Sequence, residues 1–326
     1  MEISSIRIVY MGSPDFAVGP LKKLLDKGCR IVGVITAPDR PAGRGKKLRQ
    51  SAVKEFLLEH SPALPILQPT NLKDPNFLKD LEKLQPELQV VVAFRMLPEA
   101  VWSLPGLGTL NLHASLLPQY RGAAPINHVL INGEKETGVS TFLIDQQIDT
   151  GKILLQEQIN IGEKETAGEL HDRLMYLGSE LVYETVRQMA AGTLKARSQD
   201  SLEDSDSPLK KAPKIFKEDC RISWDLPGIS IKNLIRGLSP YPGAFSFLLR
   251  HEQDKLLCKI YSASFKIRDH SDKPGTIYTD NLDRLEVAVA DGIIEIHSLQ
   301  AEGKRRMDTR DFLAGNKLSN ELSRFF

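Results

Sequence analysis

The sequence predicts an α/β fold, a Rossmann-like and mostly parallel sheet with helices on both faces, followed by a smaller β-rich domain. In the first half, short apolar runs alternate with amphipathic segments, which is typical of parallel strands joined by helices. In the second half, the expected strands are shorter and alternate apolar with polar residues. Between the halves, the polar and acidic residues 198–208 indicate an exposed connector. We therefore expect a first domain over 1–197, a linker over 198–212 and a second domain over 213–326.

Short apolar runs mark the expected strands of the first domain: 7–11, 31–36, 90–94, 109–113, 139–144 and 153–159. Between the first two strands, Ser13 is the expected N-cap of a helix that Gly28 ends. Further on, Thr166 and Glu169 form a capping box, and a stripe of leucines then predicts a helix that stops at Gly192.

The second domain shows one clear hairpin. Residues 285–297 consist of two apolar-rich runs around Asp291 and Gly292, which predicts antiparallel strands joined by a primed turn. Two helices are expected beside these strands, one beginning near Ser230 and one near Asp308.

The composition is that of an ordinary globular protein of 326 residues, 41% hydrophobic and 26% charged. Its formal net charge is +1, so a nucleic-acid surface would have to be a local basic patch. The 3 cysteines lack the Cys-x-x-Cys spacing of a zinc site or redox pair, which fits a reducing cytoplasm. The chain start lacks the pattern of a signal peptide, and no apolar run is long enough to cross a bilayer. We therefore expect a cytoplasmic protein without a metal site.

Asn111 and His113 are the first candidate site residues. They stand two positions apart in segment 109–113, and an extended strand puts alternate residues on one face, so the leucines between them should point into the core. A later loop supplies the carboxylate of Asp149. An amide, an acid/base group and a carboxylate suit acyl transfer, in which a carbonyl oxygen gains charge and protons move around it. The alternation alone favours the simpler interpretation, that Asn111 and His113 are polar residues at a strand end.

Segment 38–49 is a candidate phosphate-binding loop. It carries one acid, Asp39, against five cations: Arg40, Arg44, Lys46, Lys47 and Arg49. Interleaved glycines would let the loop mould onto phosphates, and it follows the second strand at the edge where α/β sheets bind ligands. The alternative is a solvated charged loop. The turn at 12–14 lacks Gly-x-Gly-x-x-Gly, which argues against a nicotinamide dehydrogenase.

Longer strings of residues carry a resemblance to a known family. The run 111–126, from Asn-Leu-His-Ala-Ser-Leu-Leu-Pro onward, with Asp-Thr-Gly at 149–151, closely resembles the 10-formyltetrahydrofolate-dependent formyltransferases. Gly-Ser-Pro-Asp-Phe at 12–16, the segment 38–48 and Arg-Ile-Ser-Trp at 221–224 extend the resemblance over nearly the whole chain.

The Ser-Leu-Leu-Pro run at 115–118 is specific to that group, and the 38–49 loop to its tRNA-acting branch. The resemblance implies transfer of a formyl group from 10-formyltetrahydrofolate, the co-substrate, to the α-amino group of initiator methionyl-tRNA for translation initiation. In this scheme Asn111 holds the oxyanion and His113 is a second donor or a proton acceptor. Asp149 would orient His113 and accept a proton.

The resemblance also assigns binding residues. The folate pocket is expected to be lined by Phe94, Met96, Ser115, Leu116, Leu117 and Pro118. Contacts with tRNA are expected from Arg40, Arg44, Lys46, Lys47, Lys210 and Lys211. Domain 1–197 would be the catalytic domain, and 213–326 a tRNA-binding β-barrel of the oligonucleotide-binding type. Further cations of the second half could extend that surface: Lys214, Lys217, Lys304, Arg305 and Arg306. We expect a monomer with no membrane partner and no metal.

The chain departs from the family pattern in two places. Phe94-Arg95-Met96 stands where the group usually has a Tyr-Gly pair, and Tyr120 where it often has Trp. Two alternatives remain open. A formyltransferase acting on a small amine, such as glycinamide ribonucleotide or an amino-sugar nucleotide, would share the catalytic trio of Asn111, His113 and Asp149 but would not need the basic loop at 38–49. An RNA-binding protein on an inactive α/β scaffold would have no use for the trio.

Overall fold

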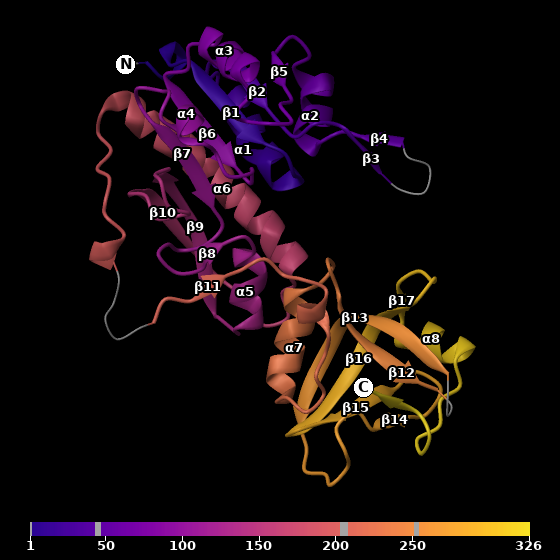
Figure 1. Ribbon diagram of the computed structural model, residues 1–326. Coiled ribbons are helices and arrows are strands. Elements are labelled where there is room, and N and C mark those ends of the chain that lie inside the picture. Colours follow the sequence, from indigo (N-terminus) through magenta and orange to yellow (C-terminus); the bar gives the residue numbers. More distant parts are fainter. Residues whose placement is uncertain (1, 43–46, 203–207, 251–253) are drawn as a thin grey trace. The chain divides into compact units, whose positions relative to one another are not determined.

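A computed structural model describes residues 2–42, 47–202, 208–250 and 254–326 (Figure 1). Internal contacts divide the chain into two compact units. The first comprises Met1–Gly122, Glu136–Ile159 and His171–Lys211, and the second comprises Ala123–Lys135, Asn160–Leu170 and Ala212–Phe326.

The first unit is built on a seven-stranded sheet with the order β10-β9-β7-β6-β1-β2-β5. Its strands are β1 (Ile8–Gly12), β2 (Ile31–Ile35), β5 (Ile66–Leu67), β6 (Leu88–Val92), β7 (Thr109–His113), β9 (Glu136–Leu143) and β10 (Ile153–Asn160). The strands from β5 to β7 pair in parallel, and β9 runs antiparallel to β7. The α/β fold with a mostly parallel sheet is therefore confirmed.

Helices connect these strands, and their bounds are α1 (Val18–Asp26), α2 (Ala52–His60), α3 (Pro75–Lys83), α4 (Glu99–Trp102) and α6 (Ala167–Ala191). The capping box of α6 is confirmed, since Thr166 N donates to Glu169 Oε2 at 2.8 Å, and Gly192 beyond its end has a φ of 69°. Ser13 as a helix N-cap is wrong. A 3₁₀ turn (Asp15–Ala17) precedes α1, and the Ser13 hydroxyl instead accepts a hydrogen bond from Ala37 N at 3.0 Å.

The predicted strand 90–94 begins and ends two residues too late, because β6 is Leu88–Val92 and Ala93 turns the chain with a φ of 46°. This turn starts the segment that contains Phe94, Arg95 and Met96. No helix in the described part of the chain is long and apolar enough to span a membrane.

The second unit is a nearly closed antiparallel sheet with the strand order β14-β15-β16-β13-β12-β18. Its strands are β12 (Ala244–Leu249), β13 (Lys255–Ile267), β14 (Ile277–Thr279), β15 (Leu285–Val289), β16 (Gly292–Ala301), β17 (Met307–Asp308) and β18 (Arg324–Phe325). A bridge between Thr276 and Arg324 brings the two ends of the sheet together. The predicted barrel-like architecture is therefore confirmed.

Helices of the second unit are α5 (Pro125–Ile131), α7 (Gly228–Gly237) and α8 (Thr309–Gly315). The helices expected near Ser230 and Asp308 are α7 and α8, and Asp308 caps α8 by accepting from Asp311 N at 2.8 Å. The hairpin of β15 and β16 is also confirmed, but its primed turn is wrong. Val289 pairs with Gly292, so the turn residues are Ala290 and Asp291, and neither has a positive φ.

Gly138 in β9 gives a stability prediction for the first unit. A Cβ atom on Gly138 would lie 2.0 Å from the Glu157 carbonyl oxygen of β10 and 2.5 Å from Leu116 Cδ2. We expect Gly138→Ala to lower the free energy of unfolding by about 2 kcal/mol or more, since the adjacent strand must move. Urea denaturation would measure this, with Gly106→Ala as the control because a Cβ there meets nothing within 4 Å. Equal stability of the two variants would contradict the prediction.

Candidate active site

His113, the last residue of β7, is buried, with 6% of its surface exposed. Its Nε2 atom lies 2.9 Å from the Tyr120 carbonyl oxygen. Because a carbonyl oxygen can only accept, Nε2 must carry the proton and donate it. In the neutral ring, Nδ1 is then the nitrogen with the free lone pair. This contact selects the tautomer of His113 and decides which atom can take up a proton.

Tyr120 holds its carbonyl toward His113 through an uncommon backbone conformation. Its φ is 61°, in the left-handed region that few non-glycine residues adopt. The peptide is held from the other side, since Tyr120 N donates to the Lys210 carbonyl at 2.6 Å. Lys210 N in turn donates to Gln119 Oε1 at 2.8 Å. A segment about ninety positions later in the chain therefore supports the partner of His113.

Asp149 faces the free nitrogen of His113. Its Oδ2 atom lies 3.9 Å from His113 Nδ1 and accepts a hydrogen bond from Gly122 N at 3.0 Å. The distance to Nδ1 exceeds that of a hydrogen bond, so the interaction between the two side chains is electrostatic. The carboxylate is close enough to attract positive charge that forms on the imidazole ring. The structure thus brings Asp149 next to His113, at a separation longer than a hydrogen bond.

Gln199 holds the loop that carries Asp149, and sequence reasoning missed it. Its Nε2 donates to the carbonyls of Asp149 at 2.9 Å and Gly151 at 2.8 Å, and its Oε1 accepts from Arg121 Nη2 at 2.7 Å. Gln199 is only 1% exposed, so the expectation that the connector is exposed is wrong at this position. A glutamine within a polar, acidic stretch carries no sequence signal for burial, because the apolar periodicity that marks a core is missing there.

Asn111 lies on the same strand as His113. Leu110 and Leu112 are buried, as the alternation predicts, while Asn111 is half-buried. Among the residues that the structure describes, the Asn111 carboxamide has no hydrogen-bond partner. Its N–H groups are therefore available to an oxygen brought into the site.

The segment 115–118 forms a fixed wall after β7. Ser115 Oγ donates to the Gln119 carbonyl at 2.6 Å, and the Ser140 hydroxyl donates to the Ser115 carbonyl at 2.6 Å. The Leu117 carbonyl accepts from Gln156 Nε2 at 2.9 Å. The side chains of Ser115, Leu117 and Pro118 are buried, whereas Leu116 is half-buried. Ser140 and Gln156 were not predicted; each stands next to further polar residues of its strand, and that local pattern does not indicate a contact with the 115–118 segment.

Phe94 and Met96, the other two expected folate contacts, follow β6. Phe94 is half-buried and Met96 is 73% exposed. Between them, Arg95 lies 5.6 Å from the centre of the Phe94 ring and donates to the carbonyls of Pro69 and Thr70. Burial and, next, the nearby Arg40 lower the pKa of Arg95. Arg95 therefore fastens this segment to the loop that follows β5.

The basic loop begins and ends in a short hairpin of β3 (Arg40–Ala42) and β4 (Lys47–Arg49). Arg40 lies opposite Arg49, and both side chains are exposed. Of Lys47 only the backbone position, opposite Ala42, is described, while Arg44 and Lys46 lie outside the described residues. Lys210 and Lys211, the latter in β11 (Lys211–Ala212), are both exposed.

Asp39, the single acid of this loop, does not offset the loop's own cations. Its carboxylate accepts from Gln68 Nε2 at 2.8 Å and from Lys54 Nζ at 2.7 Å, and Lys54 also donates to Gln68 Oε1 at 2.8 Å. The hydrogen bonds from Gln68 and Lys54 hold the pKa of Asp39 below its usual value. Within the described residues, neither Arg40 nor Arg49 forms an ion pair, so this hairpin presents uncompensated positive charge.

Comparison with known proteins identifies the family to which this chain belongs. Residues 6–186 match the family model described as formyl transferase, and residues 214–317 match that of the formyl transferase C-terminal domain. The chain belongs to the formyl transferase family, which confirms the resemblance found in the sequence.

Within this family, the chain is similar over nearly its whole length to proteins named methionyl-tRNA formyltransferase. The chain is 49% identical to a methionyl-tRNA formyltransferase of Bacteroides fragilis over 98% of each chain. It is 48% identical to one of Flavobacterium johnsoniae over 98% of this chain and 99% of that one. Among solved structures, an N-formyltransferase from Helicobacter canadensis, in complex with folinic acid and dTDP-3-aminofucose, shares the fold with a TM-score of 0.64 at 17% identity. That match covers 93% of this chain and 100% of the other.

The described residues of the structure do not form a metal-binding site. Across residues 2–42, 47–202, 208–250 and 254–326, no group of three or more His, Cys, Asp or Glu side chains is placed to hold a metal ion.

Gln199 gives a prediction about the site. We expect Gln199→Ala to lower the turnover rate about ten- to a hundredfold, because the Asp149 loop loses the side chain that fixes its two carbonyls and a small displacement of a catalytic group is costly. Formyl transfer at saturating substrates would measure this. Gln188→Ala is the matched control, since the Gln188 side chain donates to Glu184 within α6 and the contacts of its backbone carbonyl survive the substitution. Equal rates in both variants would show that the Asp149 loop does not need Gln199.

Proposed function

We propose that this protein transfers a formyl group from 10-formyltetrahydrofolate to the α-amino group of initiator methionyl-tRNA, giving N-formylmethionyl-tRNA. The observation that carries the proposal is the trio in one unit: Asn111 with an open amide, His113 with Nδ1 free, and Asp149 opposite that nitrogen at 3.9 Å. The relatives named methionyl-tRNA formyltransferase over 98% of the chain support the choice of amine.

The trio fits the needs of this reaction. An α-amino group has a pKa of about 8, so part of it is already neutral at physiological pH and can attack the formyl carbon. As the carbon–nitrogen bond forms, the formyl oxygen gains negative charge, and the free amide of Asn111 is suited to donate to it. The attacking nitrogen must then lose a proton, and His113 Nδ1 is the available acceptor.

Asp149 supports His113 in this step. Once Nδ1 is protonated, the ring is an imidazolium whose Nε2 still donates to Tyr120, and the Asp149 carboxylate stabilises its charge. The proton can then be returned to the nitrogen of the leaving folate as the bond between that nitrogen and the formyl carbon breaks. No net proton is consumed at the site, so the same residues are ready for the next turnover.

Substrate binding is assigned to two sets of residues. The formyl donor would lie against the segment that follows β6 and the wall at 115–118, where exposed Met96 and half-buried Phe94 and Leu116 offer apolar surface. The remaining folate contacts, Ser115, Leu117 and Pro118, would act through backbone atoms because their side chains are buried.

The acceptor stem of tRNA would lie on cations of the first unit: Arg40, Lys210 and Lys211, whose side chains are exposed, and Arg44, Lys46 and Lys47 of the basic loop. Guanidinium groups such as those of Arg40 and Arg49 bind phosphates bidentately. The Lys210 carbonyl accepts from Tyr120 N, and the Tyr120 carbonyl accepts from His113 Nε2. A tRNA phosphate bound by the Lys210 side chain would therefore be linked to His113 through Tyr120.

We also propose the working form of the protein: a monomer in the cytoplasm, with a catalytic domain at 1–197, a linker at 198–212 and a tRNA-binding domain at 213–326. Free, buried cysteines support this compartment. Burial raises the pKa of the Cys29 thiol to about 11 and that of Cys258 to about 12, which leaves both as unreactive thiols.

Asp149→Asn tests the role of the trio. Asparagine can still accept from Gly122 N, so folate binding should survive, but the charge facing His113 is lost and formyl transfer should fall about a hundredfold or more. Folate affinity and the rate of folate release are measured separately, with methionyl-tRNA, uncharged tRNA or glycinamide ribonucleotide as acceptor.

Two outcomes of this experiment would count against the proposal. If affinity for folate fell together with the rate, Asp149 would serve folate binding or structure instead. If the wild-type protein released folate with glycinamide ribonucleotide but not with methionyl-tRNA, a small-amine formyltransferase would replace the proposed function.

A further inference from the structure

The segment that follows β6 is held by side chains and not by its own backbone. We call residues 93–97 the Arg95 segment, and the proposed function places the formyl donor against it. Ala93 opens the segment with a φ of 46°, and residues 94–97 belong to no helix or strand. Within the described residues, the backbone groups of Arg95, Met96 and Leu97 make no hydrogen bond. The conformation of the Arg95 segment therefore depends on the side chains that anchor it.

Arg95 is one of two anchors. Its guanidinium donates to the carbonyls of Pro69 and Thr70, the latter at 2.9 Å, and lies 5.6 Å from the centre of the Phe94 ring. The second anchor is Leu97, which is 8% exposed and packs in the apolar core. A planar guanidinium can hold two neighbouring carbonyls at once in a fixed geometry, which an ammonium group on a flexible stem does not reproduce. The Arg95 side chain therefore fixes the middle of the segment.

The loop that receives Arg95 is itself fixed. Gln68 Nε2 donates to the Ala37 carbonyl and to Asp39 Oδ1, both at 2.8 Å. Lys54 Nζ donates to Gln68 Oε1 at 2.8 Å and to Asp39 Oδ2 at 2.7 Å. These bonds tie the loop to the chain that follows β2 and to α2. Arg95 therefore donates to carbonyls of a loop that is held on its other side.

The Arg95 segment begins beside the strand that carries the candidate catalytic residues. β6 and β7 pair in parallel, with Val91 opposite Asn111 and Val92 opposite Leu112. The segment leaves β6 directly after Val92, at the same edge of the sheet at which β7 ends in His113. A formyl donor bound against the segment would therefore lie next to Asn111 and His113.

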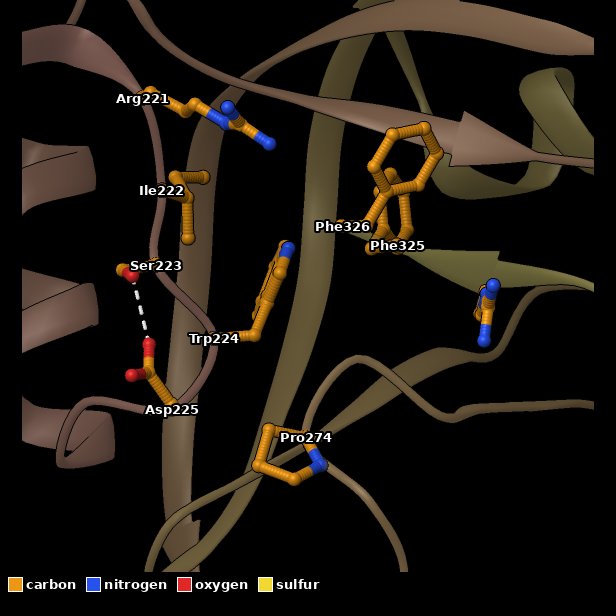
Figure 2. A pocket seen from close by; sticks show the side chains of 9 residues that line it. Arg221, Ile222, Ser223, Trp224, Asp225, Pro274, Phe325 and Phe326 are labelled. Atoms are coloured by element: carbon orange, nitrogen blue, oxygen red, sulfur yellow. Dashed lines mark hydrogen bonds between the residues drawn. The ribbon is translucent and has the colours of Figure 1, made fainter.

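The cavity in Figure 2, about 680 Å³ in volume, is a competing candidate in the second unit. Its lining includes the guanidinium of Arg221 but also the carboxylate of Asp225, which accepts from Ser223 Oγ at 2.7 Å. Trp224 is buried, and its Nε1 already donates to Ser246 Oγ at 2.9 Å. Because the lining carries both signs of charge and its polar groups are engaged, it does not define a class of ligand.

We propose that Arg95 is a positioning residue of the formyl-donor site, which keeps the Arg95 segment in the conformation that receives the folate. Both Nη groups of Arg95 donate to protein carbonyls, so the residue acts through the segment and not by touching the ligand. Without this anchor the segment occupies the binding conformation for only part of the time, and the apparent affinity for folate falls by that fraction. The inference rests on the proposed function, in which this segment contacts the formyl donor.

The test measures the affinity of the full-length protein for folinic acid without tRNA, together with KM and kcat for 10-formyltetrahydrofolate. We expect Arg95→Gln to weaken folinic acid binding and to raise KM about tenfold, with kcat within about twofold of the wild type, because the bound complex is unchanged. Arg95→Lys should recover part of the affinity, since an ammonium can still donate to a carbonyl. A partly unfolded variant would differ, because a smaller active fraction lowers kcat and leaves KM unchanged.

Gln68→Ala tests the supporting loop while Arg95 stays in place. We expect it to weaken folinic acid binding about threefold, and its combination with Arg95→Gln to lose less affinity than the product of the two single losses, since both act on the same loop. Arg7→Gln is the matched control. Arg7 also donates to two neighbouring carbonyls, those of Leu84 and Gln85, but these precede β6 at the opposite edge of the sheet. Its affinity for folinic acid should equal that of the wild type.

The inference is overturned if Arg95→Gln binds folinic acid like the wild type, loses no more affinity than Arg7→Gln, or loses kcat alone. It is also overturned if Arg95→Gln weakens binding while Gln68→Ala does not, because Arg95 would then act on the ligand directly. If the wild type binds folinic acid but does not formylate methionyl-tRNA, the proposed function falls, and the affinities of the variants still decide the role of Arg95.

Discussion

The hydrogen bond from His113 Nε2 to the Tyr120 carbonyl is the interaction on which the rest of the candidate site depends. It fixes the proton on Nε2 and so leaves Nδ1, the atom that faces Asp149, as the only ring position for proton uptake. The carbonyl reaches His113 because Tyr120 adopts a left-handed backbone, which costs free energy and is held by the bond from its amide to Lys210. The chemistry of the site is therefore set by backbone geometry in the segment after β7.

The stretch that connects the two halves of the chain also supports the candidate active site. Gln199 fixes the carbonyls of Asp149 and Gly151, Arg197 pairs with Ile153, and Lys210 supports Tyr120. Lys210 and Lys211 are also the cations to which we assign tRNA phosphates. Under this assignment, tRNA bound at Lys210 would be coupled to the orientation of His113 through two hydrogen bonds, from Tyr120 N to the Lys210 carbonyl and from His113 Nε2 to the Tyr120 carbonyl.

Features with a repeating or local chemical pattern could be predicted from the sequence. The capping box of Thr166, the burial of the two leucines beside Asn111 and the helix at Asp308 each depend on residues within a few positions, and each is present. Contacts made by single polar residues over long separations could not be predicted. Ser13 bonds to Ala37 instead of capping a helix, and Gln199 is buried within an acidic stretch. Such contacts follow from tertiary packing, which leaves no periodicity in the sequence.

The most direct test of this account is the protonation state of His113 in the folded protein. Proton–nitrogen correlation spectra of the ¹⁵N-labelled protein distinguish the two ring nitrogens, and His113→Gln identifies the signal. The account predicts a proton on Nε2 at every pH at which the protein is folded, with Nδ1 as the nitrogen that gains and loses a proton. A neutral ring protonated on Nδ1, with Nε2 titrating, would contradict it.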